Sequence, residues 1–205
     1  LRRRPKGVDV SRHRVLLLFA PFVALTLPLA AQESQDEQAR RLLEDGRIYR
    51  EQGKLKQALD NFSIVVSSFP ASDSVGQALL EIGRYRMEVE GDAEKARASF
   101  EQVTKQHARS DAAPGAYHNL GLLTLQRATT PAEIDDALAQ FARVETLYPR
   151  SPWVPRSLQA SALAHRRAGR YAEAAALSRR WVDAAAVVAA ASRLLPSLNT
   201  TVSPL

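Results

Sequence analysis

GKLKQALDNFSIVVSSFP at residues 53–70 and GDAEKARASFEQVTKQHA at residues 91–108 decide the fold of this 205-residue chain. In both stretches an Ala stands five residues after the first Gly, and a Phe stands four residues after that Ala. Residues four apart lie on the same face of an α-helix. Each stretch therefore predicts a helix that begins after a glycine turn and carries a small and an aromatic residue on its buried face.

The same pattern recurs in IDDALAQFARVETLYP at residues 134–149 and, in part, in GRYAEAAALSRRW at residues 169–181. The aligned alanines are separated by 38, 41 and 37 positions: Ala58, Ala96, Ala137 and Ala174. A Phe stands four residues after each of the first three alanines: Phe62, Phe100 and Phe141. A helix with a small residue precedes each stretch: Gly46, Gly83, Gly121 and Ala162. A single helix pair cannot bury its apolar face, whereas stacked pairs can. The sequence therefore predicts an all-α fold of about four stacked helical hairpins.

The expected limits of these units follow from Gly, Pro and capping residues. The repeat domain is predicted to span residues 32–196, with units at about 36–71, 72–110, 111–150 and 151–181, a final helix at 182–195 and a disordered tail at 197–205. Ser34 with Glu37 has the form of a capping box that starts the first helix. Thr130 with Glu133 has the same form, with Pro131 at the first helical position.

A small–Gly–aromatic first helix followed by an Ala–Phe–Pro second helix resembles the tetratricopeptide repeat (TPR) family. The resemblance implies a right-handed α-solenoid whose first helices line a concave groove. Linkers such as FPASDS and YPRSPW, at residues 69–74 and 148–153, resemble those of bacterial envelope TPR proteins. Two such groups are similar, the BamD outer-membrane assembly family and the YbgF (CpoB) family of the Tol-Pal system. The resemblance implies a role in outer-membrane assembly or envelope maintenance.

Residues 1–31 have the plan of a secretory signal peptide. Basic residues between Arg2 and Arg14 precede an apolar run from Val15 to Ala31, and polar residues follow. We expect cleavage after Ala31, with Ala30 as the alternative site, and a periplasmic or otherwise envelope-associated protein. The alternative is an uncleaved membrane anchor, for which the run is short. The chain contains no Cys, so we expect no disulfide, no Cys-based metal site and no lipid anchor on a Cys.

The net charge of +6 is unevenly distributed along the chain. Residues 1–31 contain six basic residues and one acidic residue. Residues 32–149 contain 14 basic and 19 acidic residues, and residues 150–205 contain 8 basic and 2 acidic residues. No recognised nucleic-acid motif accompanies the basic residues, so we expect no nucleic-acid partner. The basic C-terminal part supports an alternative interpretation, a structural protein that contacts a membrane surface or peptidoglycan.

Residue types that perform catalysis or bind metals are not clustered in the sequence. The His residues show no metal-binding spacing, and neighbouring carboxylates such as Glu44 and Asp45 point in different directions on a helix. No phosphate-binding loop or nucleophile motif is present. We therefore expect no enzymatic activity, no metal and no cofactor.

The resemblance places candidate partner-binding residues on the concave side: Arg40, Arg47, Arg50, Arg84, Met87, His118, Leu122 and Arg166. Arginines at such positions suit carboxylates, which they bind with paired donors. The alternative is that these arginines pair with Glu residues of their own helices. The favoured hypothesis is a non-catalytic scaffold that binds a protein or peptide partner in its groove.

Overall fold

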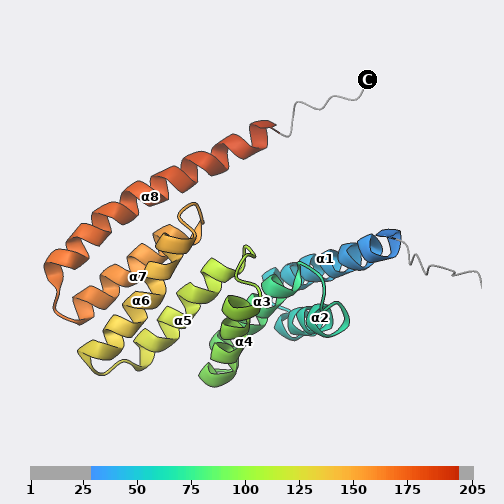
Figure 1. Ribbon diagram of the computed structural model, residues 1–205, viewed down its shortest axis with the longest axis horizontal. Coiled ribbons are helices and arrows are strands. Elements are labelled where there is room, and N and C mark those ends of the chain that lie inside the picture. The colour runs from blue at the N-terminus through green and yellow to red at the C-terminus, as the bar shows by residue number, and fades with distance from the viewer. Residues whose placement is uncertain (1–28, 199–205) are drawn as a thin grey trace, which may run out of the picture.

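A computed structural model describes residues 29–198, and this part of the chain is all-α (Figure 1). Its helices are α1 (Leu29–Glu51), α2 (Leu55–Ser68), α3 (Val75–Glu88), α4 (Ala93–Gln106), α5 (Ala113–Arg127), α6 (Pro131–Leu147), α7 (Trp153–Arg167) and α8 (Tyr171–Leu198). Residues 29–198 contain no strand. The predicted fold class is therefore confirmed.

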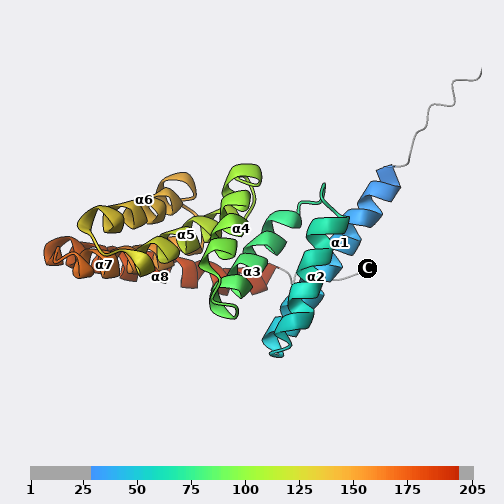
Figure 2. The ribbon, with the colours of Figure 1, turned by 90° about the horizontal axis from the view of Figure 1, so that it is seen from below.

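The helices form four consecutive antiparallel hairpins, α1–α2, α3–α4, α5–α6 and α7–α8. Each helix packs on the next one along the chain, so every hairpin contacts its neighbour. The first helices also contact one another directly, α3 with α5 and α5 with α7. Figure 2 shows α6 on one side of α5 and α7. This arrangement is an α-solenoid in which α3, α5 and α7 form one continuous layer.

Glycine makes the turn inside three of the four hairpins. Gly53, Gly91 and Gly169 have φ values of 74°, 66° and 74°, in the left-handed region that other residues rarely adopt. The third hairpin uses the predicted capping box instead. The Thr130 hydroxyl accepts a hydrogen bond from the Glu133 N–H at 3.3 Å, and the Glu133 carboxylate accepts from the Thr130 N–H at 2.9 Å. Hydrogen bonds from the Thr129 and Thr130 N–H groups lower the pKa of Glu133 to about 2.

The connections between hairpins share one geometry. In each connection a serine N–H donates to the carbonyl three residues earlier at 2.9 Å: Ser72 to Phe69, Ser110 to His107 and Ser151 to Tyr148. The Tyr148 hydroxyl also donates to the carbonyl of Ala108 at 2.7 Å, which ties one connection to the previous one. The residues that lengthen these repeats beyond the common 34 are therefore ordered turns.

The core of each of the first three hairpins is built on one glycine–phenylalanine contact. The aligned alanines Ala58, Ala96 and Ala137 are at most 2% exposed, as predicted. A Cβ atom added to Gly46, Gly83 or Gly121 would lie 2.4 Å from the ring of Phe62, Phe100 or Phe141, respectively. Each ring therefore packs on the glycine of its own hairpin, a contact that the repeat spacing alone does not predict.

Two helix limits differ from the prediction. The first helix begins at Leu29, so Ser34 lies inside it and is not its N-cap. Residues 29–33 are strong helix formers, which explains the earlier start. The predicted break before a separate final helix at 182–195 is also wrong, because α8 is continuous from Tyr171 to Leu198. Its sequence is rich in Ala and contains no Gly or Pro between Gly169 and Pro196.

The predicted signal peptide lies almost entirely outside the described residues. Of residues 1–31, the structure describes only Leu29 to Ala31, as the first residues of α1. Within residues 29–198, none of the helices combines the length and the hydropathy of a membrane-spanning segment.

Candidate functional site

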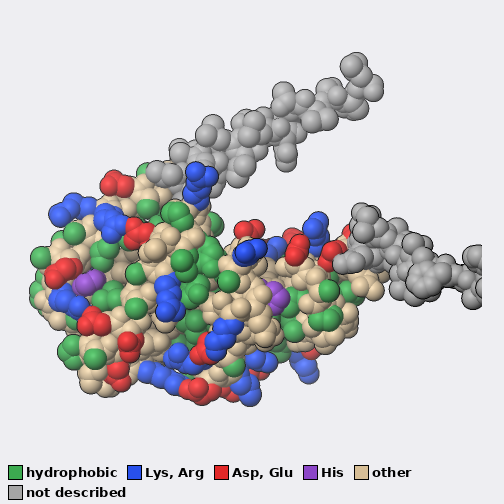
Figure 3. Space-filling view, in the orientation of Figure 1, with side chains coloured by type: hydrophobic (Ala, Val, Ile, Leu, Met, Phe, Trp, Pro, Cys, Tyr) green, Lys and Arg blue, Asp and Glu red, His purple; other side chains and the backbone are tan. Residues whose placement is uncertain are grey.

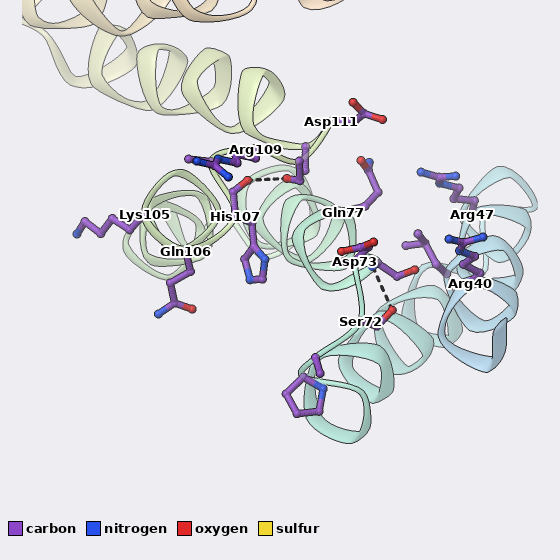
Figure 4. Close-up of a pocket in the computed structure, with 17 residues that line it drawn as sticks. Arg40, Arg47, Ser72, Asp73, Gln77, Lys105, Gln106, His107, Arg109 and Asp111 are labelled. Carbon is purple, nitrogen blue, oxygen red and sulfur yellow. Dashed lines mark hydrogen bonds between the residues drawn. The ribbon is translucent and has the colours of Figure 1, made fainter. Parts of the chain in front are cut away.

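One hollow in the solenoid surface, named the first hollow, lies between α1, α3 and the connections that precede α3 and α5. Its volume is about 790 Å³. Arg40 and Arg47 of α1 lie on one side, with Asp73 and Gln77 facing them (Figure 4). Arg47 also pairs with the exposed Glu44 of its own helix at 3.3 Å. Because acidic and basic groups share its lining, this hollow has mixed charge.

The second hollow, of about 700 Å³, lies between α5, α7 and α8. Its lining consists of His118, Leu122, Arg156, Gln159, Ala160, Ala162, Leu163, Arg166, Ser178, Trp181 and Val182. None of these residues is acidic, so the charges of the lining are those of its arginines. Leu163 and Val182 are 56% and 58% exposed, so the lining presents large apolar side chains to solvent. Figure 3 shows the hollowed side of the solenoid between α8 and the first hairpins, with hydrophobic side chains at its base.

His118 lies at the buried wall of the second hollow. It is 8% exposed, its Nδ1 lies 3.1 Å from the Ser157 hydroxyl, and its ring centroid is 5.3 Å from that of Trp153. Burial, together with the charge of Arg156, lowers the pKa of His118 to about 4. The imidazole is therefore neutral at pH 7 and is chiefly a packing group.

Arg50 and Arg84 are engaged within the protein. Both approach the carboxylate of Glu81, which is only 5% exposed: Arg50 forms an ion pair with it, and Arg84 lies 3.6 Å from the same oxygen. Arg84 also contacts Glu88 of its own helix at 3.4 Å. The Glu81 carboxylate therefore holds two of the arginines that the sequence analysis assigned to partner binding.

The structure thus divides the predicted partner-binding residues into three groups. Arg40 and Arg47 line the first hollow, and His118, Leu122 and Arg166 line the second. Arg50, Arg84 and Met87 line neither of these two hollows, and Met87 packs against the core of the first hairpins.

Several basic residues of the C-terminal part are also engaged internally. Arg167 donates to the carbonyls of Leu125, at 2.6 Å, and Ala128, and so satisfies the C-terminal end of α5. Arg170 pairs with Asp135 at 2.6 Å, and Arg180 pairs with Glu145. Sequence reasoning missed these contacts, as it missed Glu81, because the partners are more than thirty positions apart.

The fourth hairpin lacks the ring that fills the other three. Ser178 stands four residues after Ala174, where the first three hairpins have Phe, and Ala162 stands where they have Gly. Both residues line the second hollow. The sequence contained this signal, because the repeat pattern is interrupted at Ser178, but its consequence was not predicted.

Among the described residues, no group of three His, Asp or Glu side chains is arranged to hold a metal ion. The second hollow offers arginines, an amide and apolar side chains for binding, and the first hollow also offers carboxylates. These groups suit recognition of a macromolecular segment.

Comparisons with known proteins agree with this architecture. Residues 46–72 and 77–110, which cover most of the first two hairpins, match the sequence profile of the tetratricopeptide repeat. Two crystal structures of MamA are similar in fold. The first has a TM-score of 0.55 and 18% sequence identity, and the match covers 78% of this chain and 85% of that chain. The second has a TM-score of 0.54 and 16% sequence identity, and the match covers 84% of this chain and 82% of that chain. No curated protein matches the chain at a significant level. The chain therefore contains tetratricopeptide repeats, and its hairpins stack as an α-solenoid.

Proposed function

We propose that the chain is a non-catalytic interaction scaffold of the bacterial cell envelope, which binds a segment of a partner protein on the side of the solenoid formed by α5, α7 and α8. Tetratricopeptide repeats generally mediate protein–protein interaction, and solenoids provide extended concave surfaces for it. The observation that carries the proposal is the second hollow, which combines exposed apolar side chains with arginines and has no acidic residue in its lining. Such a surface is suited to an apolar segment with acidic neighbours.

The envelope location is supported by residues 1–31, which have the form of a signal peptide. The linkers that resemble those of the BamD and YbgF families support a role in outer-membrane assembly or envelope maintenance. Export predicts a mature protein that lacks these residues and is released by osmotic shock. Recovery of the full-length chain in the cytoplasmic fraction would contradict this part of the proposal.

The alternative function, electrostatic contact with a membrane surface or peptidoglycan, receives less support. It requires the basic residues after Arg150 to face outward. Arg167, Arg170 and Arg180 instead bind carbonyl or carboxylate groups of this chain. Fewer of the basic residues are therefore available for an extended anionic surface.

Site-specific photo-crosslinking in the native cell tests the binding surface. A photoreactive amino acid at Leu163 reports on the second hollow, and one at Ala139 reports on the exposed side of α6. We expect a partner to crosslink at position 163 and not at position 139. Arg166→Glu should reduce the crosslinked product severalfold, whereas Lys56→Glu, on the exposed side of α2, should leave it unchanged. Equal products at both positions, or no product at position 163, would contradict the proposal.

A further inference from the structure

The second hollow opens where the fourth hairpin lacks an aromatic ring. In the first three hairpins a buried Phe ring lies directly on a glycine of the preceding helix. The corresponding residues of the fourth hairpin, Ala162 and Ser178, both line the second hollow. The Ser178 hydroxyl donates to the carbonyl of Ala174 at 2.9 Å, so this short side chain is turned back toward its own helix. The position that a ring would occupy is therefore part of the hollow.

The lining around this position suits a large apolar side chain. Leu122 and Ala160 lie at the inner wall, and Trp181, Leu163 and Val182 surround the opening. The high exposure of Leu163 and Val182 means that an incoming ring would remove existing apolar surface from water. An aromatic anchor in a pocket of this kind is the usual centre of a protein interface.

The charged groups of the lining specify what should flank that anchor. Arg156 and Arg166 belong to α7, and Arg156 lies over the Trp153 ring at 4.9 Å from its centroid. The first hollow differs, because Asp73 and Asp111 share its lining with four basic residues and can pair with them. In the second hollow no carboxylate of the lining competes for the arginines, so they are available to an acidic segment.

We infer that the second hollow binds a phenylalanine-sized side chain of a partner segment in which Asp or Glu residues flank that side chain. The inserted ring supplies, from another protein, the group that Phe62, Phe100 and Phe141 supply in the first three hairpins. Arg156 and Arg166 pair with the flanking carboxylates. This inference rests on the proposed function and adds the chemistry of the segment that is bound.

The sharpest test restores the packing of the first three hairpins. The double substitution Ala162→Gly with Ser178→Phe supplies both the ring and the glycine on which it packs, so the chain fills its own hollow. The probe is a short fluorescent peptide with a central Phe between Glu residues, titrated by anisotropy against the full chain. We expect binding to the filled variant to be at least about tenfold weaker than to the parent. Ala176→Phe, the matched control, places the same ring at an exposed position of α8 outside the lining and should bind like the parent.

Two further peptides and one surface variant complete the experiment. A peptide with Ser in place of Phe, and one with Lys in place of Glu, should each bind the parent at least about tenfold more weakly. Arg166→Glu, which changes an exposed residue, should weaken binding of the acidic peptide and strengthen that of the Lys peptide. Equal binding of the Phe and Ser peptides, or undiminished binding to the filled variant, would overturn the inference.

The crosslink at position 163 separates this inference from the proposed function. If the filled variant still forms the same cellular crosslink, the groove binds its partner without the ring pocket, and only the inference is wrong. If no cellular partner crosslinks while the acidic Phe peptide binds as expected, the scaffold proposal is wrong and the chemistry of the pocket stands.

Discussion

Arg50 of α1 forms an ion pair with Glu81 of α3, so the first helices of two successive hairpins are joined through a carboxylate that is only 5% exposed. Arg84 and Gln77, each of α3, also reach this carboxylate, at 3.6 and 3.4 Å. A buried carboxylate requires such partners, because an unpaired one would be strongly destabilising. The contact therefore fixes how the second hairpin sits on the first.

Replacing Arg50 by Ala should lower the free energy of unfolding by about 2 kcal/mol, because Glu81 then loses one of its charged partners but keeps Arg84. Urea unfolding followed by circular dichroism measures the change. Arg47→Ala is the matched control, since Arg47 pairs with an exposed Glu44 and should contribute less than about 0.5 kcal/mol. Equal effects of the two substitutions would show that Glu81 does not depend on Arg50.

Gly83→Ala should destabilise the second hairpin even though Ala is the better helix former. The added Cβ would lie 2.4 Å from the ring of Phe100, which is fully buried and cannot move aside. We expect a cost of about 1–3 kcal/mol from overpacking, opposed by about 1 kcal/mol of helix propensity. Adding Phe100→Leu should make the effect of Gly83→Ala smaller, which a double-mutant cycle measures. A variant that is more stable than the parent would contradict the proposed packing.

Much of this architecture could be predicted from local sequence patterns. The spacing from Ala58 to Phe62, repeated at Ala96 and Ala137, reports which face of a helix is buried, and Gly or Thr-Pro marks where a helix begins. These signals act within one helix or one turn. The hairpins, their order and the capping box at Thr130 therefore followed from the sequence.

The candidate site could be predicted only in part, because the neighbours of a surface arginine depend on how the hairpins stack. Arg50 and Arg166 both occupy first helices and both are basic, yet Arg50 meets a carboxylate 31 positions away and Arg166 lines a hollow. Sequence spacing cannot distinguish these cases. The continuous α8 differs from these cases, because a local signal agrees with it: no Gly or Pro stands between Gly169 and Pro196.

Acidification should destabilise the protein through His118 before most carboxylates titrate. Burial lowers the pKa of His118 from 6.5 to about 4, so between these values the unfolded chain binds more protons than the folded one. The free energy of unfolding should therefore fall as the pH falls, by about 2 kcal/mol between pH 7 and pH 5. The lowered pKa of His165 acts in the same direction.

His118→Gln isolates this contribution, because it removes the titrating group and leaves His165 in place. Urea unfolding at pH 7 and pH 5 should show a smaller loss of stability for the variant than for the parent. The carboxylates of Asp92 and Glu133, whose pKa values are lowered, remain ionised throughout this range. Identical losses in parent and variant would mean that the His118 imidazole can be protonated in the folded state.

Ala96→Arg should be the most damaging of these substitutions, because Ala96 is 0% exposed on the buried face of α4. A long side chain would overpack this buried position, and its charged guanidinium would lack an ion-pair partner there. We therefore expect the free energy of unfolding to fall by about 4 kcal/mol. Ala98→Arg is the matched control, since the same change is made two residues away on the exposed side of the same helix. Because residues two apart do not share a helix face, the control should unfold like the parent. Thermal melts followed by circular dichroism should separate the two variants clearly. If both variants melt at the same temperature, the recurring alanines do not lie at tightly packed helix contacts within the hairpins.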